Sequence, residues 1–359
     1  MKNIKKKFRY FLQKVPENVL NALLALSFIT FLLAIFDVET PKKIEICDIS
    51  SYANTIDNFW SKYLYIFGYV QVKAIVCIVF VILLLLRICK VLLRPKAIII
   101  CHNSFSNAIS SYDESIVTDY VVKKIDINLV DQMGQDNIVG AICDQDRFIK
   151  EVLKKCDEFT TLIYYGIAHI PLIFRAGFQI GDEGAVKLLH KYRNSQSIFK
   201  EISSDPETYR AQMYPRTNTY SNSSREMLVV VATSLEVVDS DLSIFRTKGI
   251  RCELGFYMTD PSMYDFDVID SYAAMHRLRT KVLSDIRQTV QRENIERIHL
   301  VLATSSDFAF YLAQGFSQYH DPEIIIYQYE HSTSEKYPWG ISNKQPPETA
   351  VINQSLNNN

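Results

Sequence analysis

The sequence predicts an α/β protein in which two membrane-spanning helices precede a body made of two similar halves. Two long apolar runs lie within the first 96 residues. The later sequence alternates short branched apolar runs with amphipathic stretches, and parts of it match one another at fixed offsets. Of the 359 residues, 48% are hydrophobic and 22% are charged, which excludes a disordered chain.

The charge of the chain divides at the same place. Residues 1–96 hold 14 Lys and Arg against 6 Asp and Glu, a net charge of +8, whereas residues 97–359 hold 25 against 34, a net charge of −9. Duplex nucleic acid is a poor ligand for an acidic body, because nonspecific affinity needs neutralised phosphates. The seven cysteines form no Cys-x-x-Cys pair, so neither a zinc ribbon nor a disulfide framework is expected.

The first apolar run, residues 18–36, has nineteen uncharged residues and would span roughly 28 Å as a helix, close to the hydrocarbon thickness of a bilayer. The second run, about 66–86, is interrupted only by Lys73, which is expected to snorkel or, alternatively, to serve a helix contact or pore. Basic residues flank both outer ends, which predicts a multi-pass protein with both termini and the body in the cytoplasm. A cleaved signal peptide is the competing interpretation of the first run.

The body is predicted to contain eight mostly buried, parallel strands. They are expected at 97–101, 120–129, 161–167, 185–192, 227–233, 250–258, 298–304 and 323–330. Amphipathic helices are expected at about 136–156 and 267–292.

Two blocks of the body match at an offset of 138 residues. Residues 162–178 align without a gap on 300–316, each with the pattern of a strand, a sharp turn and a short helix ending in Gly-Phe, and 186–192 align on 324–330. Residues 98–104 align on 229–235 at an offset of 131. Chance similarity of two ordinary strand–helix units is the alternative, but the order of the blocks favours a repeat.

The repeat divides the chain into segments. Residues 1–96 are the membrane region, and residues 97–341 are the body. The halves of the body are predicted at about 97–195 and 226–340, joined by a linker or flap at 203–226 that is rich in turn formers. The polar tail, 342–359, is predicted to be disordered.

The common catalytic signatures are missing from the sequence: GxxxxGK[ST], GxGxxG after a strand, GxSxG and HExxH. None of the seven histidines has a ligand spacing with Cys or another His. The acidic strip from Asp260 to Asp270 fits a solvated turn better than a metal site. No catalytic residue and no metal site are therefore predicted.

Polar turns follow four predicted strands and are the candidate ligand site. In open parallel sheets, ligands collect at the carboxyl ends of strands, where hydroxyls and helix N-termini can hold anions and rings can stack on bases. Helix capping is the alternative role of Ser305 or Ser306, and the two roles are compatible. The predicted ligand-binding residues are His102, Asn103, Ser104, His169, Thr233, Ser234, Thr304, Ser305, Ser306 and Phe308.

These residues resemble a known family. GIAHIPLIFRAGF with VKLLHKYR, then LVLATSSDFAFYLAQGF with IIIYQYE and YPWGI, is similar to the SAVED domain, a cyclic-oligonucleotide sensor of bacterial CBASS anti-phage systems. The two apolar runs before it resemble the transmembrane-SAVED effector class. Phe199 departs from the pattern, where a Trp is expected.

The resemblance implies two fused CARF-like, Rossmann-like halves that bind a cyclic tri- or dinucleotide made by a CD-NTase synthase. Ligand-driven assembly into a homo-oligomer would then disrupt or permeabilise the lipid bilayer of the inner membrane, in abortive infection, without enzymatic turnover or a cofactor. Two alternatives stay open: a membrane-anchored, ring-nuclease-like enzyme using His102 or His169, and an anchored protein-binding module.

Overall fold

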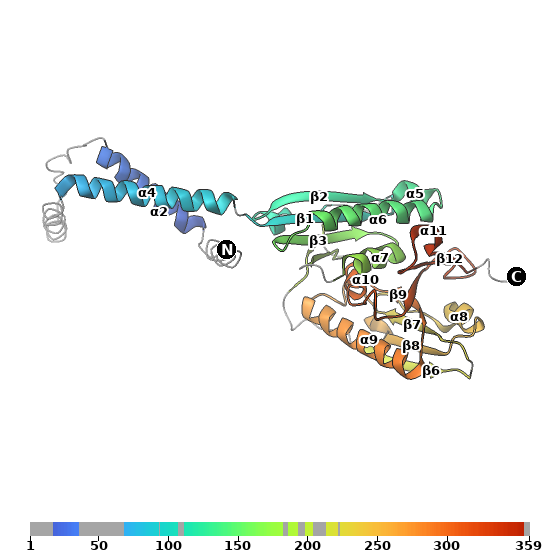
Figure 1. The fold of residues 1–359 in the computed structure, drawn as a ribbon. Helices are drawn as coiled ribbons and strands as arrows, with labels where there is room; N and C mark the ends of the chain where they lie inside the picture. The colour runs from blue at the N-terminus through green and yellow to red at the C-terminus, as the bar shows by residue number, and fades with distance from the viewer. Residues whose placement is uncertain are drawn as a thin grey trace. The chain divides into compact units, whose positions relative to one another are not determined.

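The computed structural model describes residues 17–35, 68–92, 94–106, 111–181, 186–192, 198–203, 213–221 and 223–354. The chain divides into two compact units, Met1–Arg94 and Pro95–Asn359 (Figure 1). The predicted external loop, 37–62, lies outside the described residues, as does the side chain of Lys73.

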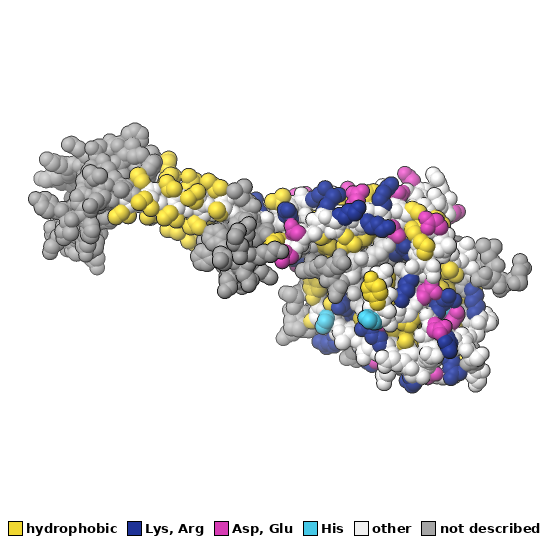
Figure 2. All heavy atoms as spheres, viewed as in Figure 1, with side chains coloured by type: hydrophobic (Ala, Val, Ile, Leu, Met, Phe, Trp, Pro, Cys, Tyr) yellow, Lys and Arg dark blue, Asp and Glu magenta, His cyan; other side chains and the backbone are white. Residues whose placement is uncertain are grey.

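The first unit contains two helices at the places of the two apolar runs, α2 (Glu17–Ile35) and α4 (Gly68–Leu92). They contact each other, with the rings of Phe28 and Phe80 5.9 Å apart. Figure 2 shows hydrophobic side chains over the surface of this unit, and Ile75, Ile78 and Leu85 are all more than half exposed.

Among the residues that the structure describes, no helix combines the length and the apolar character that crossing a membrane requires. The prediction of two membrane spans, at about 18–36 and 66–86, is therefore not supported by the structure, although a helix forms at each place.

The second unit contains two sheets. The first has the strand order β2-β1-β3-β4-β5, in which β1 to β4 run parallel and β5 is antiparallel. Its strands are β1 (Lys96–Asn103), β2 (Val121–Asn128), β3 (Thr160–Ile167), β4 (Val186–His190) and β5 (Lys200–Glu201). Helices α5 (Val130–Gly134) and α6 (Ile138–Lys155) follow β2, and α7 (Ile170–Ile180) follows β3.

The second sheet has the order β12-β11-β10-β9-β7-β8-β6, with four central parallel strands and antiparallel strands outside them. Its strands are β6 (Met213–Thr219), β7 (Glu226–Ala232), β8 (Cys252–Met258), β9 (Arg297–Ala303), β10 (Glu323–Gln328), β11 (Trp339–Ser342) and β12 (Val351–Asn353). Its helices are α8 (Ser243–Thr247), α9 (Tyr272–Glu293), α10 (Ser306–Ala313) and α11 (Pro347–Ala350).

The two sheets repeat one pattern, as the sequence predicts. The order β2-β1-β3-β4 of the first sheet is matched by β8-β7-β9-β10 of the second, and the matched strands follow each other along the chain in the same sequence. Helix α6 corresponds to α9, and α7 corresponds to α10. All eight predicted strands and both predicted amphipathic helices are present, with shifts of a few residues at their ends. The expectation that the strands are mostly buried is wrong for β2, where only Ile125 and Ile127 are buried.

Helices α7 and α10 pack against each other and join the two sheets around one apolar core. The ring of Tyr164, on β3, stacks on Phe310 of α10 with centroids 3.8 Å apart. A Cβ atom at Gly177 of α7 would overlap the carbonyl oxygen of Phe310 and lie 3.0 Å from the Cβ of Ala313. Glycine at this position therefore permits the close approach of the two helices.

Two predicted segments are corrected by the structure. The predicted linker, 203–226, contains β6, which pairs with β8 along its whole length. The predicted disordered tail, 342–359, is ordered as far as Gln354: β12 pairs with β11, and Ala350 is fully buried. Polar residues hold this tail, because Asn343 exchanges two hydrogen bonds with the backbone of Ile324 and Gln354 N–H donates to the Pro338 carbonyl.

Replacing Gly177 with Val should lower the thermal unfolding midpoint markedly. The added side chain must displace the Phe310 carbonyl, and overpacking of this kind costs about 1–3 kcal/mol or more. Gly134→Ala is the matched control, because a Cβ there meets nothing within 4 Å and alanine favours the helix. Equal midpoints for Gly177→Val and the wild type would contradict the packing described.

Candidate functional site

A pocket of about 500 Å³ lies where strands β3 and β4 of the first sheet end near the start of α10 in the second half. Its walls come from both halves of the repeat. It is lined by Tyr164, Tyr165, Gly166, Ile167, Leu189, His190, Lys191, Tyr192, Phe199, Phe266, Ser305, Ser306 and Asp307. The pocket is thus at the carboxyl ends of parallel strands, where ligands of such sheets gather.

Ser305 and Ser306 are the predicted site residues that line this pocket. Ser305 occupies the N-cap position of α10, but its side chain makes no capping hydrogen bond. Ser305 is buried, with a relative exposure of 8% for the residue, and its hydroxyl has no hydrogen-bond partner among the described residues. A buried hydroxyl without a partner beside an uncapped helix start is suited to receive a polar ligand group.

His190 joins the halves at the pocket wall. Its Nδ1 lies 3.0 Å from a carboxylate oxygen of Asp307, on α10, and its Nε2 lies 3.1 Å from Asp267. Burial lowers the pKa of His190, but the Asp307 charge and hydrogen bonds to both carboxylates raise it to about 9. The imidazole is therefore protonated at neutral pH, and its charge is already satisfied by two carboxylates.

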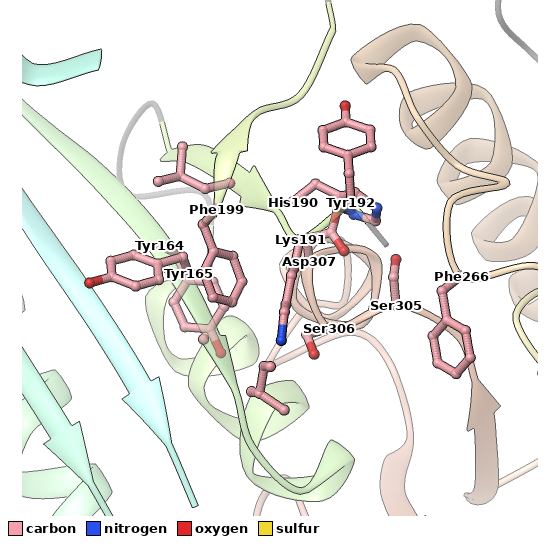
Figure 3. A pocket seen from close by; sticks show the side chains of 13 residues that line it. Tyr164, Tyr165, His190, Lys191, Tyr192, Phe199, Phe266, Ser305, Ser306 and Asp307 are labelled. Carbon is pink, nitrogen blue, oxygen red and sulfur yellow. Dashed lines mark hydrogen bonds and ion pairs between the residues drawn. The ribbon is translucent and has the colours of Figure 1, made fainter. Parts of the chain in front are cut away.

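Aromatic side chains and a lysine form the rest of the pocket wall. In Figure 3 the side chain of Lys191 extends between the ring of Tyr165 and Ser306. The rings of Tyr165 and Phe199 lie 5.0 Å apart, and Tyr192 meets His190 edge to face at 4.6 Å. This combination of rings with a cation suits a ligand that has both bases and phosphates.

The turns after β1 and β3 bring the predicted residues Ser104 and His169 together, while His102 lies near the end of β1. The Ser104 hydroxyl lies 2.6 Å from Nδ1 of His169 and accepts the backbone N–H of His169 at 2.8 Å. His102 is fully buried, with Nδ1 3.0 Å from the Tyr164 hydroxyl. Burial lowers the pKa of His102 to about 3, helped by His169, and burial lowers that of His169 to about 4. Both rings are neutral and do not line the pocket.

The remaining predicted residues do not line the pocket. Thr233 donates to the Thr304 hydroxyl at 2.8 Å, and both are buried. Ser234 is buried with an unpartnered hydroxyl among the described residues, and Phe308 belongs to the core. The amide of Asn103 contacts the sulfur of Cys101 at 3.4 Å, and its side-chain oxygen accepts the Ile167 N–H at 3.5 Å.

A family model matches residues 145–342. It is the model of SAVED, a sensor domain described as "SMODS-associated and fused to various effectors". This match covers more than half of the chain and includes every residue that lines the pocket. The chain belongs to the SAVED family. No curated protein sequence matches the chain.

The solved structures that match this chain include receptors that contain SAVED/CARF domains. The Acinetobacter baumannii Cap4 receptor with the cyclic trinucleotide 3′3′3′-cAAA has 13% sequence identity and a TM-score of 0.49 over 79% of this chain and 60% of that chain. The same receptor with 2′3′3′-cAAA has 14% identity and a TM-score of 0.48, with the same coverage. The Moraxella osloensis Cap4 receptor has 10% identity and a TM-score of 0.40, over 72% of this chain and 50% of that one. The chain thus spans about 60% of the length of the Acinetobacter receptor.

Sequence reasoning missed the residues of the SAVED domain that give the pocket its charge. His190 is the last residue of β4 and Lys191 follows it, and Asp267 lies in the acidic strip assigned to a solvated turn. His190 and Asp307 are 117 positions apart, so no local spacing reveals their contact. The end of the matched segment 186–192 already contains His190 and Lys191, so the polar residues at the end of this strand were a usable signal. Within the described part of the chain, no cluster of acids, histidines and cysteines is suited to hold a metal ion.

The contacts of His190 with Asp307 and Asp267 predict that the stability of the SAVED domain depends on pH. Because the folded-state pKa of His190 is raised from 6.5 to about 9, its stabilising effect is complete below about pH 6.5 and is lost as the pH rises through 9. His190→Gln should remove this loss, which is on the order of 3 kcal/mol at most. Thermal unfolding midpoints from pH 6 to 10 measure it.

The matched control for this comparison is His320→Gln, at an exposed position outside the pocket. Its midpoint should fall with pH in parallel with the wild type. If the thermal midpoint of His190→Gln fell with pH in parallel with the wild type, His190 would not be protonated in the folded protein at neutral pH.

Proposed function

We propose that this SAVED protein senses a cyclic oligonucleotide second messenger, which binds in the pocket between its two halves. The main support is the Ser305 hydroxyl, which is buried at the start of α10 and has no hydrogen-bond partner among the described residues. The same pocket is lined by Lys191 and several aromatic rings. A helix N-terminus and a cation hold phosphate, and rings stack on bases. Membership of a sensor-domain family supports the same function.

The balance of charge in the pocket supports a small ligand. His190 and Lys191 contribute two positive charges there, and Asp267 and Asp307 contribute two negative charges that hold His190. The Lys191 ammonium therefore remains available to bind a phosphate group. A local site of this kind suits a small cyclic ligand better than duplex nucleic acid, whose binding needs many neutralised phosphates.

The proposed output is damage to the inner membrane in CBASS anti-phage defence, through assembly of a homo-oligomer and without enzymatic turnover. Ligand binding can shift assembly only by its differential affinity for the assembled state. The exposed apolar side chains of the α2–α4 unit, among them Ile75, Ile78 and Leu85, support a membrane role, because large exposed apolar surfaces are typical of membrane or protein contacts. Linear product formed from a cyclic ligand by the purified protein would indicate a ring-nuclease-like enzyme instead.

Ser305→Ala should weaken ligand binding about tenfold to a hundredfold, the loss of one hydrogen bond to a charged group. Calorimetry with a panel of cyclic di-adenylate, cyclic di-guanylate and the two cyclic tri-adenylates measures the affinity. The thermal midpoint without ligand should not fall, since the hydroxyl has no partner in the described structure.

Ser234→Ala is the matched control. Ser234 is also buried and also has an unpartnered hydroxyl among the described residues, but it does not line the pocket. Its affinity should equal that of the wild type. Equal affinities for Ser305→Ala and the wild type would place the ligand elsewhere.

The membrane role predicts that the full-length protein floats with lipid vesicles and resists alkaline carbonate extraction from cells. Ile82→Lys should weaken this association, because a charge within the apolar surface opposes its burial in lipid. Val139→Lys, at an exposed position of α6, is the control and should float like the wild type. Complete release of the wild type by carbonate would contradict lipid burial.

A further inference from the structure

The first sheet has an open edge at strand β2. Within the described part of the chain, β2 pairs only with β1 and forms the outer edge of the sheet (Figure 1). Six of its eight residues are exposed, and Val121 and Val122 are 56% and 39% exposed. An edge of this kind presents unpaired N–H and C=O groups to which another strand can add.

The other outer strands of the two sheets are less suited to accept a strand. Strands β5 and β12 have two and three residues. Strand β6 contains Pro215, whose nitrogen cannot donate a hydrogen bond. Strand β2 is eight residues long and contains neither proline nor glycine, so it is the edge best suited to pair with another strand.

The hydrogen bonds of β2 show which of its residues face outward. The Val121 N–H donates to the Pro95 carbonyl at 2.9 Å. The Leu129 N–H donates to the Asn103 carbonyl at 2.8 Å. Since the backbone groups of successive residues point to opposite sides of a strand, every second residue from Val121 to Leu129 faces β1. The residues whose backbone groups face away from β1 are Val122, Lys124, Asp126 and Asn128.

Two of the outward-facing residues carry opposite charges. The Lys124 Nζ atom lies 2.9 Å from a carboxylate oxygen of Asp126, and the two side chains are 41% and 57% exposed. Because they are two residues apart, both lie on the same face of the sheet. The edge is therefore complementary in charge to a second copy of itself that runs in the opposite direction.

This charge pattern selects one register. A twofold axis through Ile125 would place Lys124 opposite Asp126 of the second copy, and Asp126 opposite Lys124 of that copy. A shift of two residues in one direction would place Lys124 opposite Lys124, and the opposite shift would place Asp126 opposite Asp126. Only the register centred on Ile125 pairs unlike charges in both copies.

We propose that β2 is a dimerisation edge, at which the β2 strands of two copies pair antiparallel about a twofold axis through Ile125. The first sheet would then continue from one copy into the other. This contact goes beyond the proposed function, since no residue of β2 lines the pocket and no ligand takes part in it. One strand pair buries less surface than a standard protein interface, so the dimer should dissociate on dilution.

Reversal of the charges at this edge tests the proposal. Analytical ultracentrifugation of the full-length protein in detergent measures the dimer dissociation constant over a range of concentrations. Lys124→Asp places two acids opposite each other in both cross-strand pairs, and Asp126→Lys places two lysines there. Each variant should raise the dissociation constant about tenfold or more.

A mixture of the two variants separates contacts between copies from contacts within one copy. In a mixed dimer of Lys124→Asp with Asp126→Lys, both cross-strand pairs again hold opposite charges, so the dimer should return to the wild-type level. Loss of the ion pair within each chain could not be reversed by mixing, because neither variant contains that pair.

Lys155→Asp is the matched control. Lys155 of α6 pairs with Glu151 at 3.2 Å, and the two side chains are 38% and 52% exposed, much like those of Lys124 and Asp126. The change in net charge is the same, but the position is not in β2. This variant should dimerise like the wild type, and thermal midpoints confirm that all three variants fold.

Three results would overturn the proposal. A wild type that is monomeric at every concentration would show that the lysines of β2 keep the edge unpaired. A wild-type dissociation constant for Lys124→Asp would place the contact between copies elsewhere. A mixture that remains monomeric would show that the charges do not meet across the dimer. None of these results bears on ligand affinity, which is measured separately.

Discussion

The close packing of α7 against α10 is the constraint on which the rest of the body depends. Both helices begin at the carboxyl end of a central strand, so their contact fixes the two turns that precede them relative to each other. Gly177 lets the helices approach, and the stacked rings of Tyr164 and Phe310 extend the contact from one sheet into the other half. The pocket lies where these turns meet strand β4. A change in the helix packing would therefore change the ligand site directly.

A second set of contacts ties the end of the chain to the first half. The buried Arg175 guanidinium donates two hydrogen bonds to Asp146, at 3.0 and 2.7 Å, and others to the carbonyls of Ser342 and Gln345. A buried ion pair needs such additional partners to offset desolvation. These carbonyls come from a segment without apolar periodicity, which is why the sequence suggested disorder there. The tail is therefore ordered by contacts with distant segments. The same holds for β6, whose residues are mostly exposed and which is held by its pairing with β8.

The parts of the fold that could be predicted are those that depend on local pattern. Branched apolar runs such as Ile98–Ile100 and Val229–Val231 are buried on both faces of a parallel sheet and identify their strands directly. The turns after those strands could be predicted as the site region for the same reason. Which side chains face the pocket could not, because that depends on contacts between distant segments. Thr233 and Thr304 satisfy each other, and His102 turns inward to Tyr164, whereas Ser305 is left open.

The repeat shows how a duplicated fold can carry unlike side chains at equivalent backbone positions. Duplication gives two corners with the same backbone, at each of which a strand end meets the start of a helix from the other half. His190, the last residue of β4, contacts the start of α10, and the equivalent Gln328 of β10 accepts the N–H of Ile170 at the start of α7. The charge at one corner is then set by two carboxylates that hold His190 and leave Lys191 open, and the aligned positions of the other corner contain amide and aromatic groups in their place. The same backbone repeat that builds the pocket thus leaves its specificity to a few side chains at strand ends.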